Sequence, residues 1–263
     1  MSDDPRSRRE DRPWWSDDPD GDDPTPIADA RRAREAAVVR RTTRDAPQPV
    51  VAGSVGILGG TFDPVHVGHL AVAEEVREAL GLETVLFVPN GVPPHKLDRP
   101  ISAPEHRVSM IEAAIADNAA FRLSRVEIDR PGPSYAVDTA EQLAAETREA
   151  GREPDLWWIL SAEALAGLLT WREPARLLRA CRMAVVPRPG ARPPGRSWME
   201  EHFPGLEDRV VTLDGPELGV SSTLIRDRVA AGRSIRYLVP AAVLAYIDAH
   251  HLYASDPWRK DRP

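Results

Sequence analysis

Short apolar stretches alternate with helical patterns along the chain from Val50 onward. The apolar stretches predict strands at Val55–Leu58, Thr84–Val88, Phe121–Val126, Leu156–Leu160, Met183–Val186 and Val210–Leu213. Apolar spacing and capping residues predict helices at Leu70–Leu80, Pro104–Asp117, Val137–Ala150, Glu163–Leu169, Pro174–Ala180, Ser222–Ala231 and Pro240–His250. Such alternation is typical of a parallel sheet with helices on both faces. The sequence therefore predicts a doubly wound α/β domain over residues 50–263, with its last helix over a sheet edge.

Residues 1–49 differ in composition from the rest of the chain. Asp, Arg and Pro dominate there, and aliphatic residues are scarce before Ala36. Because such a segment buries too little apolar surface to offset the entropy of folding, we expect a disordered extension.

Composition and charge limit the class of protein. The single cysteine, Cys181, excludes an intramolecular disulfide and fits a reducing compartment. The formal net charge of −7 argues against a general nucleic-acid surface. The chain shows no signal-peptide core, and no apolar run approaches the roughly 20 residues of a membrane span. We expect a cytoplasmic protein without membrane or nucleic-acid partners.

Glycines and two histidines join the first predicted strand to the first predicted helix, in Gly59-Gly60-Thr61-Phe62-Asp63-Pro64-Val65-His66-Val67-Gly68-His69-Leu70. Loops at the carboxyl ends of parallel strands form the ligand crevice, where a helix N-terminus favours an anion. Glycine permits close approach of a ligand, and histidines spaced i, i+3 share a helix face. The pattern matches neither the phosphate loop nor the dinucleotide fingerprint, which indicates a different nucleotide chemistry. Two histidines alone are more often an incidental pair at a helix cap.

Three later segments follow predicted strands and so fall at the same edge of the sheet. Pro93-Pro94-His95-Lys96 could form a cationic lip or an exposed charged loop. Ser134-Tyr135-Ala136 opens a predicted helix, and Ser161-Ala162-Glu163 precedes Trp171, which could be a core aromatic. Residues 187–204 are rich in Pro, Arg and Gly, so we expect a solvated surface loop there rather than a lid.

A further segment, Ser221-Ser222-Thr223-Leu224-Ile225-Arg226, lies where the sixth predicted helix begins. Its hydroxyls and free N–H groups suit phosphates, and Arg226 could make a forked contact with phosphate oxygens. The same residues would also fit a capped helix with a surface arginine and no bound phosphate.

The stretch GGTFDPVHVGHL resembles the HxGH signature of the nucleotidyltransferase superfamily, in the form typical of nicotinate-nucleotide adenylyltransferases. Four more segments resemble that family in the same order: Pro-Pro-His-Lys, Ser-Tyr-Ala-x-Asp-Thr, the region from Ser161 to Trp171, and Ser-Ser-Thr-x-Ile-Arg. The resemblance covers residues 54 to about 253. It implies a Rossmann-like nucleotidyltransferase fold.

The resemblance also implies an activity and a set of site residues. The expected reaction is adenylyl transfer from ATP to nicotinate mononucleotide in NAD biosynthesis, giving nicotinate adenine dinucleotide and pyrophosphate. The residues expected to contact the reacting phosphates are His66, His69 and Arg226. The residues expected to bind ATP are Gly59, Gly60, Thr61, Phe62, Ser222, Thr223 and Ile225. The residues expected to bind the acceptor are Lys96, Tyr135, Ala136, Glu163, Trp171 and Arg172.

Trp171 is expected to stack on the pyridine ring, and backbone N–H groups near Tyr135 and Ala136 to bind its carboxylate. Mg²⁺ is expected to bridge phosphate oxygens with few protein ligands, since it prefers to keep its water. No residue is therefore predicted as a dedicated metal ligand.

Three positions depart from the family pattern: Ala136 replaces threonine, Ser161 replaces glycine and Glu163 replaces aspartate. Two alternatives stay open. The acceptor could be nicotinamide mononucleotide, phosphopantetheine or flavin mononucleotide, or the protein could be a nucleotide-binding regulatory relative with weak catalysis. The sequence leaves open whether the chain forms a homo-oligomer.

Overall fold

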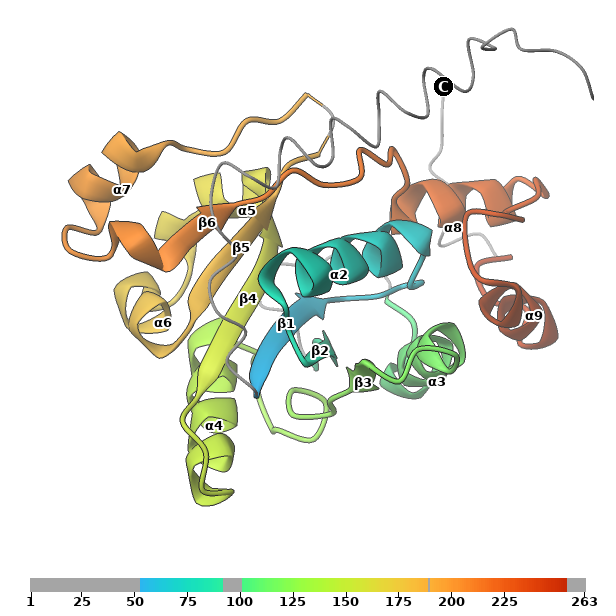
Figure 1. Cartoon of the computed structure of the whole chain (residues 1–263). Coiled ribbons are helices and arrows are strands. Elements are labelled where there is room, and N and C mark those ends of the chain that lie inside the picture. Colours follow the sequence, from blue (N-terminus) through green and yellow to red (C-terminus); the bar gives the residue numbers. More distant parts are fainter. Residues whose placement is uncertain (1–52, 92–100, 189, 255–263) are drawn as a thin grey trace, which may run out of the picture. The chain divides into compact units, whose positions relative to one another are not determined.

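The computed structural model describes residues 53–91, 101–188 and 190–254. The predicted N-terminal extension, His95 and Lys96 lie outside the described residues. Six parallel strands form one sheet in the order β3-β2-β1-β4-β5-β6 (Figure 1). The strands are β1 Ser54–Gly60, β2 Thr84–Pro89, β3 Phe121–Leu123, β4 Asp155–Ser161, β5 Arg182–Val186 and β6 Val210–Thr212. The predicted doubly wound parallel sheet is confirmed.

Helices connect the strands and continue beyond the last one (Figure 1). The α-helices are α2 Val67–Leu80, α3 Pro104–Ile115, α4 Ala136–Glu149, α5 Ala162–Ala166, α6 Pro174–Ala180, α7 Arg196–His202, α8 Ser222–Ala230 and α9 Ala241–Ala249. Two single 3₁₀ turns are η1 Leu168–Thr170 and η2 Glu207–Arg209. Gly81 ends α2 in the left-handed conformation, φ 62° and ψ 37°, which glycine adopts without steric cost.

The two faces of the sheet are buried by different helices. Successive strand residues point to opposite faces, so the neighbours Ile57 and Leu58 enter different hydrophobic cores. The core of Leu58 contains residues of α2, α3, α8 and α9, including Val76, Met110, Ile225 and Val243. The core of Ile57 contains residues of α4, α5, α6 and α7, including Val137, Leu165, Leu177 and Met199. This arrangement explains why the strands read as nearly continuous apolar runs.

The order of the strands reverses at β1. From β1 the chain adds β2 and β3 on one side and then crosses to β4 on the other. In such sheets, ligands bind in the crevice beyond the carboxyl ends of the strands at this reversal. The point lies between the carboxyl ends of β1 and β4, which are Gly60 and Ser161.

Four sequence predictions need correction. Residues 187–204 contain helix α7, because Met199 and Phe203 lie one helical turn apart and both bury against the core of Ile57. The third strand ends at Leu123, and residues 126–128 form a turn. The predicted helix Glu163–Leu169 divides at Gly167 into α5 and η1. The final helix packs against α3 rather than directly on a sheet edge.

Within the described ranges, no helix has both the length and the apolar character that a membrane span requires.

Candidate active site

The two histidines of the first motif stack on each other at the N-terminus of α2. His66 is the residue before the helix, in extended conformation with φ −147° and ψ 170°. The ring centroids of His66 and His69 lie 3.7 Å apart at an interplanar angle of 21°. The His66 backbone N–H donates to His69 Nδ1 at 3.2 Å. A neutral His69 ring therefore carries its proton on Nε2, where it can be donated to a ligand.

His66 borders the cavity described below, but its ring is almost completely buried. Only 4% of the residue is exposed, and its Nδ1 has no hydrogen-bond partner within the described part of the chain. An unsatisfied buried polar atom costs free energy, so this ring nitrogen destabilises the unliganded site.

Both histidines are neutral in the unliganded site. Burial and then the nearby Arg188 charge lower the pKa of His66 to about 4. Burial, followed by the charges of His66 and Arg188, lowers the pKa of His69 well below its usual value. At neutral pH the rings therefore act as N–H donors and not as cations.

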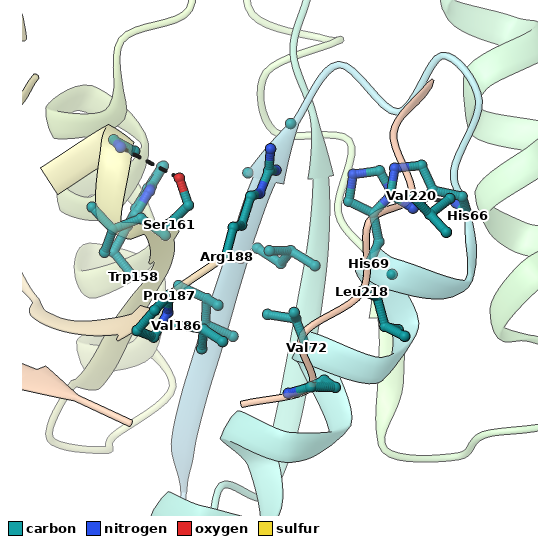
Figure 2. A pocket seen from close by; sticks show the side chains of 18 of the residues that line it. His66, His69, Val72, Trp158, Ser161, Val186, Pro187, Arg188, Leu218 and Val220 are labelled. Atoms are coloured by element: carbon teal, nitrogen blue, oxygen red, sulfur yellow. Dashed lines mark hydrogen bonds between the residues drawn. The ribbon is translucent and has the colours of Figure 1, made fainter. Parts of the chain in front are cut away.

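A cavity of about 300 Å³ opens at the carboxyl ends of β1 and β4 (Figure 2). The first motif lines one side of it, and the end of β4 with Trp171 lines the other. Figure 2 shows Arg188 projecting between the histidines and the Trp158–Ser161 side. The polar and aromatic residues that line the cavity are His66, His69, Trp158, Ser161, Trp171 and Arg188.

The glycines of the first motif leave room on the floor of this cavity. A Cβ on Gly59 would lie 3.0 Å from Trp158 Cζ2, tighter than side chains normally tolerate. Phe62, at φ 51°, holds a left-handed conformation that a bulky residue adopts only where the surroundings enforce it. Phe62 is 2% exposed and packs edge-on against His69, with ring centroids 4.9 Å apart. It therefore supports the histidine pair from the core.

The last motif folds against the first. Ser222 Oγ donates to the Pro64 carbonyl at 2.8 Å, and Arg226 Nη1 donates to the Asp63 carbonyl at 2.6 Å. The structure thus joins two segments that are more than 150 residues apart, as the sequence predicts. These contacts go to backbone carbonyls, and neither Ser222 nor Arg226 lines the cavity.

The other predicted ATP residues of α8 lie around this contact. Thr223 Oγ1 accepts from Arg226 Nη2 at 3.4 Å, and Ile225 is fully buried in the core of Leu58. Helix α8 is capped by Ser221, whose hydroxyl accepts from the Leu224 N–H at 3.1 Å.

Buried polar side chains fix the turn of the first motif. Tyr253 Oη donates to Asp63 Oδ1 at 2.6 Å, and the Ser102 N–H donates to Asp63 Oδ2 at 3.1 Å. Arg107, which is 1% exposed, donates from Nη1 to the Thr61 carbonyl at 3.0 Å and from Nε to the Ser102 carbonyl at 3.1 Å. Helix α3 and the segment after α9 therefore hold the turn from behind.

Of the predicted acceptor residues that the structure describes, Trp171 lines the cavity, and Tyr135, Ala136, Glu163 and Arg172 do not. Trp171 lines it and meets Trp158 edge-on, with ring centroids 6.4 Å apart. The Arg172 guanidinium lies 4.6 Å from the Tyr135 ring centroid, a cation–π contact. Tyr135 directly precedes α4, so the first N–H groups of that helix, beginning with Ala136, have no intrahelical partner.

The structure gives Ser161 a role that glycine could not fill. Its hydroxyl caps α5 by accepting from the Ala164 N–H at 3.3 Å, as Figure 2 shows. Glu163 is exposed in the first turn of α5, where hydrogen bonding from Ser161 is the main cause that lowers its pKa. The serine and the longer carboxylate thus form one local arrangement.

The sequence analysis missed Arg188, Arg107 and Tyr253. The sequence does contain a signal for Arg188, because a cation that directly follows a predicted strand lies at the carboxyl edge of the sheet. The sequence contains no such signal for Arg107 or Tyr253. Their hydrogen-bond partners, Thr61 and Asp63, are far away in sequence.

Comparison with known proteins identifies the family of this chain. A family model described as cytidylyltransferase-like matches residues 57–228. This chain belongs to that family. It is 51% identical over 199 residues to a "probable nicotinate-nucleotide adenylyltransferase" of Roseiflexus sp. (strain RS-1), covering 76% of this chain and 97% of the relative. A protein of the same name from Symbiobacterium thermophilum is 44% identical over 203 residues, covering 76% and 94%.

Solved structures support the fold. Nicotinic acid mononucleotide adenylyltransferase of Plasmodium falciparum, complexed with NaAD, matches with a TM-score of 0.60 and 17% identity, covering 76% of this chain and 97% of that chain. The same protein complexed with APC matches with a TM-score of 0.59. The family resemblance and the Rossmann-like nucleotidyltransferase fold inferred from the sequence are therefore confirmed.

Proposed function

We propose that this protein transfers the adenylyl group of ATP to nicotinate mononucleotide, giving nicotinate adenine dinucleotide and pyrophosphate, a step of NAD biosynthesis. The observation that carries the proposal is the stacked pair of neutral histidines at the N-terminus of α2, facing Arg188 and Trp171 across one cavity. The name shared by the curated relatives supports the choice of acceptor.

The reaction needs positioning and charge stabilisation more than covalent help. A phosphate oxygen of the mononucleotide attacks the α-phosphorus of ATP in line, and the bond to the bridging oxygen breaks. Pyrophosphate leaves with the electron pair, so negative charge grows on the leaving group. No protein nucleophile is required, and Cys181 would be a poor one because burial raises the pKa of its thiol to about 12.

The residues of the first motif would form the ATP half of the site. Gly59 and Gly60 let the nucleotide approach the backbone, while His69 Nε2–H and the ring of His66 would face the phosphates. Arg188 supplies a fixed positive charge for the phosphates of either substrate. In this arrangement Arg226 and Ser222 hold the turn of the motif in place.

The opposite wall would form the acceptor half. The Trp171 ring offers a flat surface for the pyridine, and the free N–H groups of α4 near Tyr135 and Ala136 suit its carboxylate. Arg172 and Glu163 flank this region, and Lys96 is proposed as a further contact to the substrate's negative charge.

Mg²⁺ is proposed to enter with ATP. The described residues contain no group of three or more His, Cys, Asp or Glu side chains that could hold a metal ion. Phosphate oxygens and water would supply most of its ligands, because this ion gives up water reluctantly. When bound, it neutralises phosphate charge during the transfer.

A pyrophosphate-release assay with an acceptor panel tests the proposal. The panel holds ATP with nicotinate mononucleotide, nicotinamide mononucleotide, phosphopantetheine or flavin mononucleotide, and ATP alone as the control. We expect the highest kcat/KM with nicotinate mononucleotide. A higher value with another acceptor would reassign the substrate, and ATP binding without pyrophosphate release from any acceptor would indicate the regulatory alternative.

A further inference from the structure

Glu127 is a buried carboxylate that does not line the cavity. It lies in the turn after β3 and is 2% exposed. Charged side chains are almost never this buried unless they are paired or hydrogen-bonded. It lies between the ends of β2 and β3 and the start of α4. Its hydrogen-bond partners therefore show how these segments are connected.

Both carboxylate oxygens accept hydrogen bonds from other segments. Asn90 Nδ2 donates to Glu127 Oε2 at 3.3 Å, and Thr139 Oγ1, which is fully buried in α4, donates to Glu127 Oε1 at 2.8 Å. Arg130 Nη1 donates to the same Thr139 hydroxyl at 3.1 Å. Burial raises the pKa of Glu127, while hydrogen bonds from Thr139, Asn90 and Ser134 and the charge of Arg130 oppose this rise.

Asn90 carries the network to the ATP motif. The Asn90 N–H donates to the Gly60 carbonyl at 2.9 Å, and Asn90 Oδ1 accepts from Thr61 Oγ1 at 3.4 Å. Asn90 therefore connects Glu127 to the Gly60–Thr61 turn, which leads to the histidine pair.

Ser134 carries the network to the start of α4. Its hydroxyl accepts from the Gly91 N–H at 3.0 Å, and Tyr135 follows directly. A Cβ on Gly91 would lie 2.2 Å from the Glu127 carbonyl oxygen, so the two segments pack too closely for any side chain at position 91. The residue after β2 thus contacts both Glu127 and the residue before Tyr135.

We propose that Glu127 is a positioning residue that holds the N-terminus of α4 at a set distance from the Gly60–Thr61 turn. This inference rests on the proposed function, in which the turn belongs to the ATP half and the start of α4 to the acceptor half. By joining them, Glu127 would align the acceptor phosphate with the α-phosphorus of ATP. In-line attack is sensitive to such alignment, since a misplacement of about 1 Å can cost about 10²-fold in rate.

Glu127→Gln tests this role with little change of shape. The new side chain is neutral, and it keeps both contacts only if its N–H₂ donates to the Thr139 hydroxyl, so the two hydrogen bonds to a charged acceptor are lost. We expect kcat/KM for nicotinate mononucleotide to fall by about tenfold or more, while the Kd of ATP stays within about twofold. Glu149→Gln, which removes the same charge from the exposed last turn of α4, should leave both values unchanged.

A double variant separates positioning from simple destabilisation. When Glu127→Gln is combined with Asn90→Asp, the new amide at position 127 can donate to the new carboxylate at position 90, which can still accept from Thr61. We expect the double variant to recover much of the acceptor kcat/KM, whereas Asn90→Asp alone, which opposes two carboxylates, should be worse than Glu127→Gln.

Three results would overturn the inference: unchanged acceptor kinetics in Glu127→Gln, equal losses for both substrates, or no recovery in the double variant. Failure of the proposed function looks different, because the wild-type protein would then release no pyrophosphate with nicotinate mononucleotide.

Discussion

The low pKa of His66 has a measurable consequence for stability. In the folded protein this pKa is about 4, against 6.5 for an unperturbed histidine. Below pH 6.5 the unfolded chain binds a proton that the folded state excludes. Acidification from pH 6.5 toward pH 4 therefore destabilises the fold, and the effect is absent above pH 6.5. His66→Asn removes the titrating ring and keeps a residue that is favoured before a helix.

The expected size follows from the difference between the two pKa values. At pH 5 the His66 ring costs about 2 kcal/mol of folding free energy relative to pH 8, and the cost approaches about 3 kcal/mol near pH 4. Because His66 is only 4% exposed, solvent screens this free-energy cost very little. His69, whose pKa is also lowered by burial, adds a destabilisation of the same sign in both proteins.

Urea unfolding of wild type and His66→Asn at pH 8 and pH 5 measures the effect. The difference in unfolding free energy between the two proteins should shift by about 2 kcal/mol in favour of His66→Asn on going to pH 5. His251→Asn, at an exposed position, tests whether the shift is specific to the buried ring. An equal pH dependence in wild type and His66→Asn would refute the placement of a neutral, buried His66 in this site.

Three further predictions concern the site and its support. His69→Ala and Arg188→Gln should each lower kcat/KM for pyrophosphate release by about 10²-fold, the scale of losing a donor that stabilises developing charge; wild-type rates in both would contradict the assignment. Tyr253→Phe should lower the free energy of unfolding in urea by about 1–3 kcal/mol, because Asp63 Oδ1 loses a buried donor. Removal of residues 1–49 should leave kcat unchanged in the same assay, since the composition of this segment gives it too little apolar surface to form part of the folded domain.

Local sequence was sufficient for the arrangement of the sheet. Strand-like runs such as Leu156–Leu160 lie within strands, because residues buried on both faces leave an unbroken apolar signal. The first motif was likewise predictable, since its glycines and histidines are neighbours in sequence. The loop prediction over 187–204 failed because proline and arginine content outweighed Met199 and Phe203, whose partners lie elsewhere in the chain.

The support of the site could not be predicted in the same way. Tyr253 and Asp63 are 190 residues apart, and their contact depends on how α9 packs against α3. The role of Arg226 as a phosphate ligand stays a prediction, made because its motif supplies a helix start and a cation. The structure shows that its guanidinium reaches the Asp63 carbonyl, a backbone partner that no side-chain pattern reveals.

One charge explains two properties of the cavity. Arg188 is the only charged side chain among the described residues that line it, and it also helps to lower the pKa of both histidines. The unliganded site therefore combines one fixed cation with neutral N–H donors and the N-terminus of α2. Such a set can bind the phosphates of two substrates without the mutual repulsion of three adjacent cations in the empty site. In the proposed reaction the charge of Arg188 would stabilise the charge that grows on the leaving pyrophosphate, so we expect the loss of Arg188 to lower kcat.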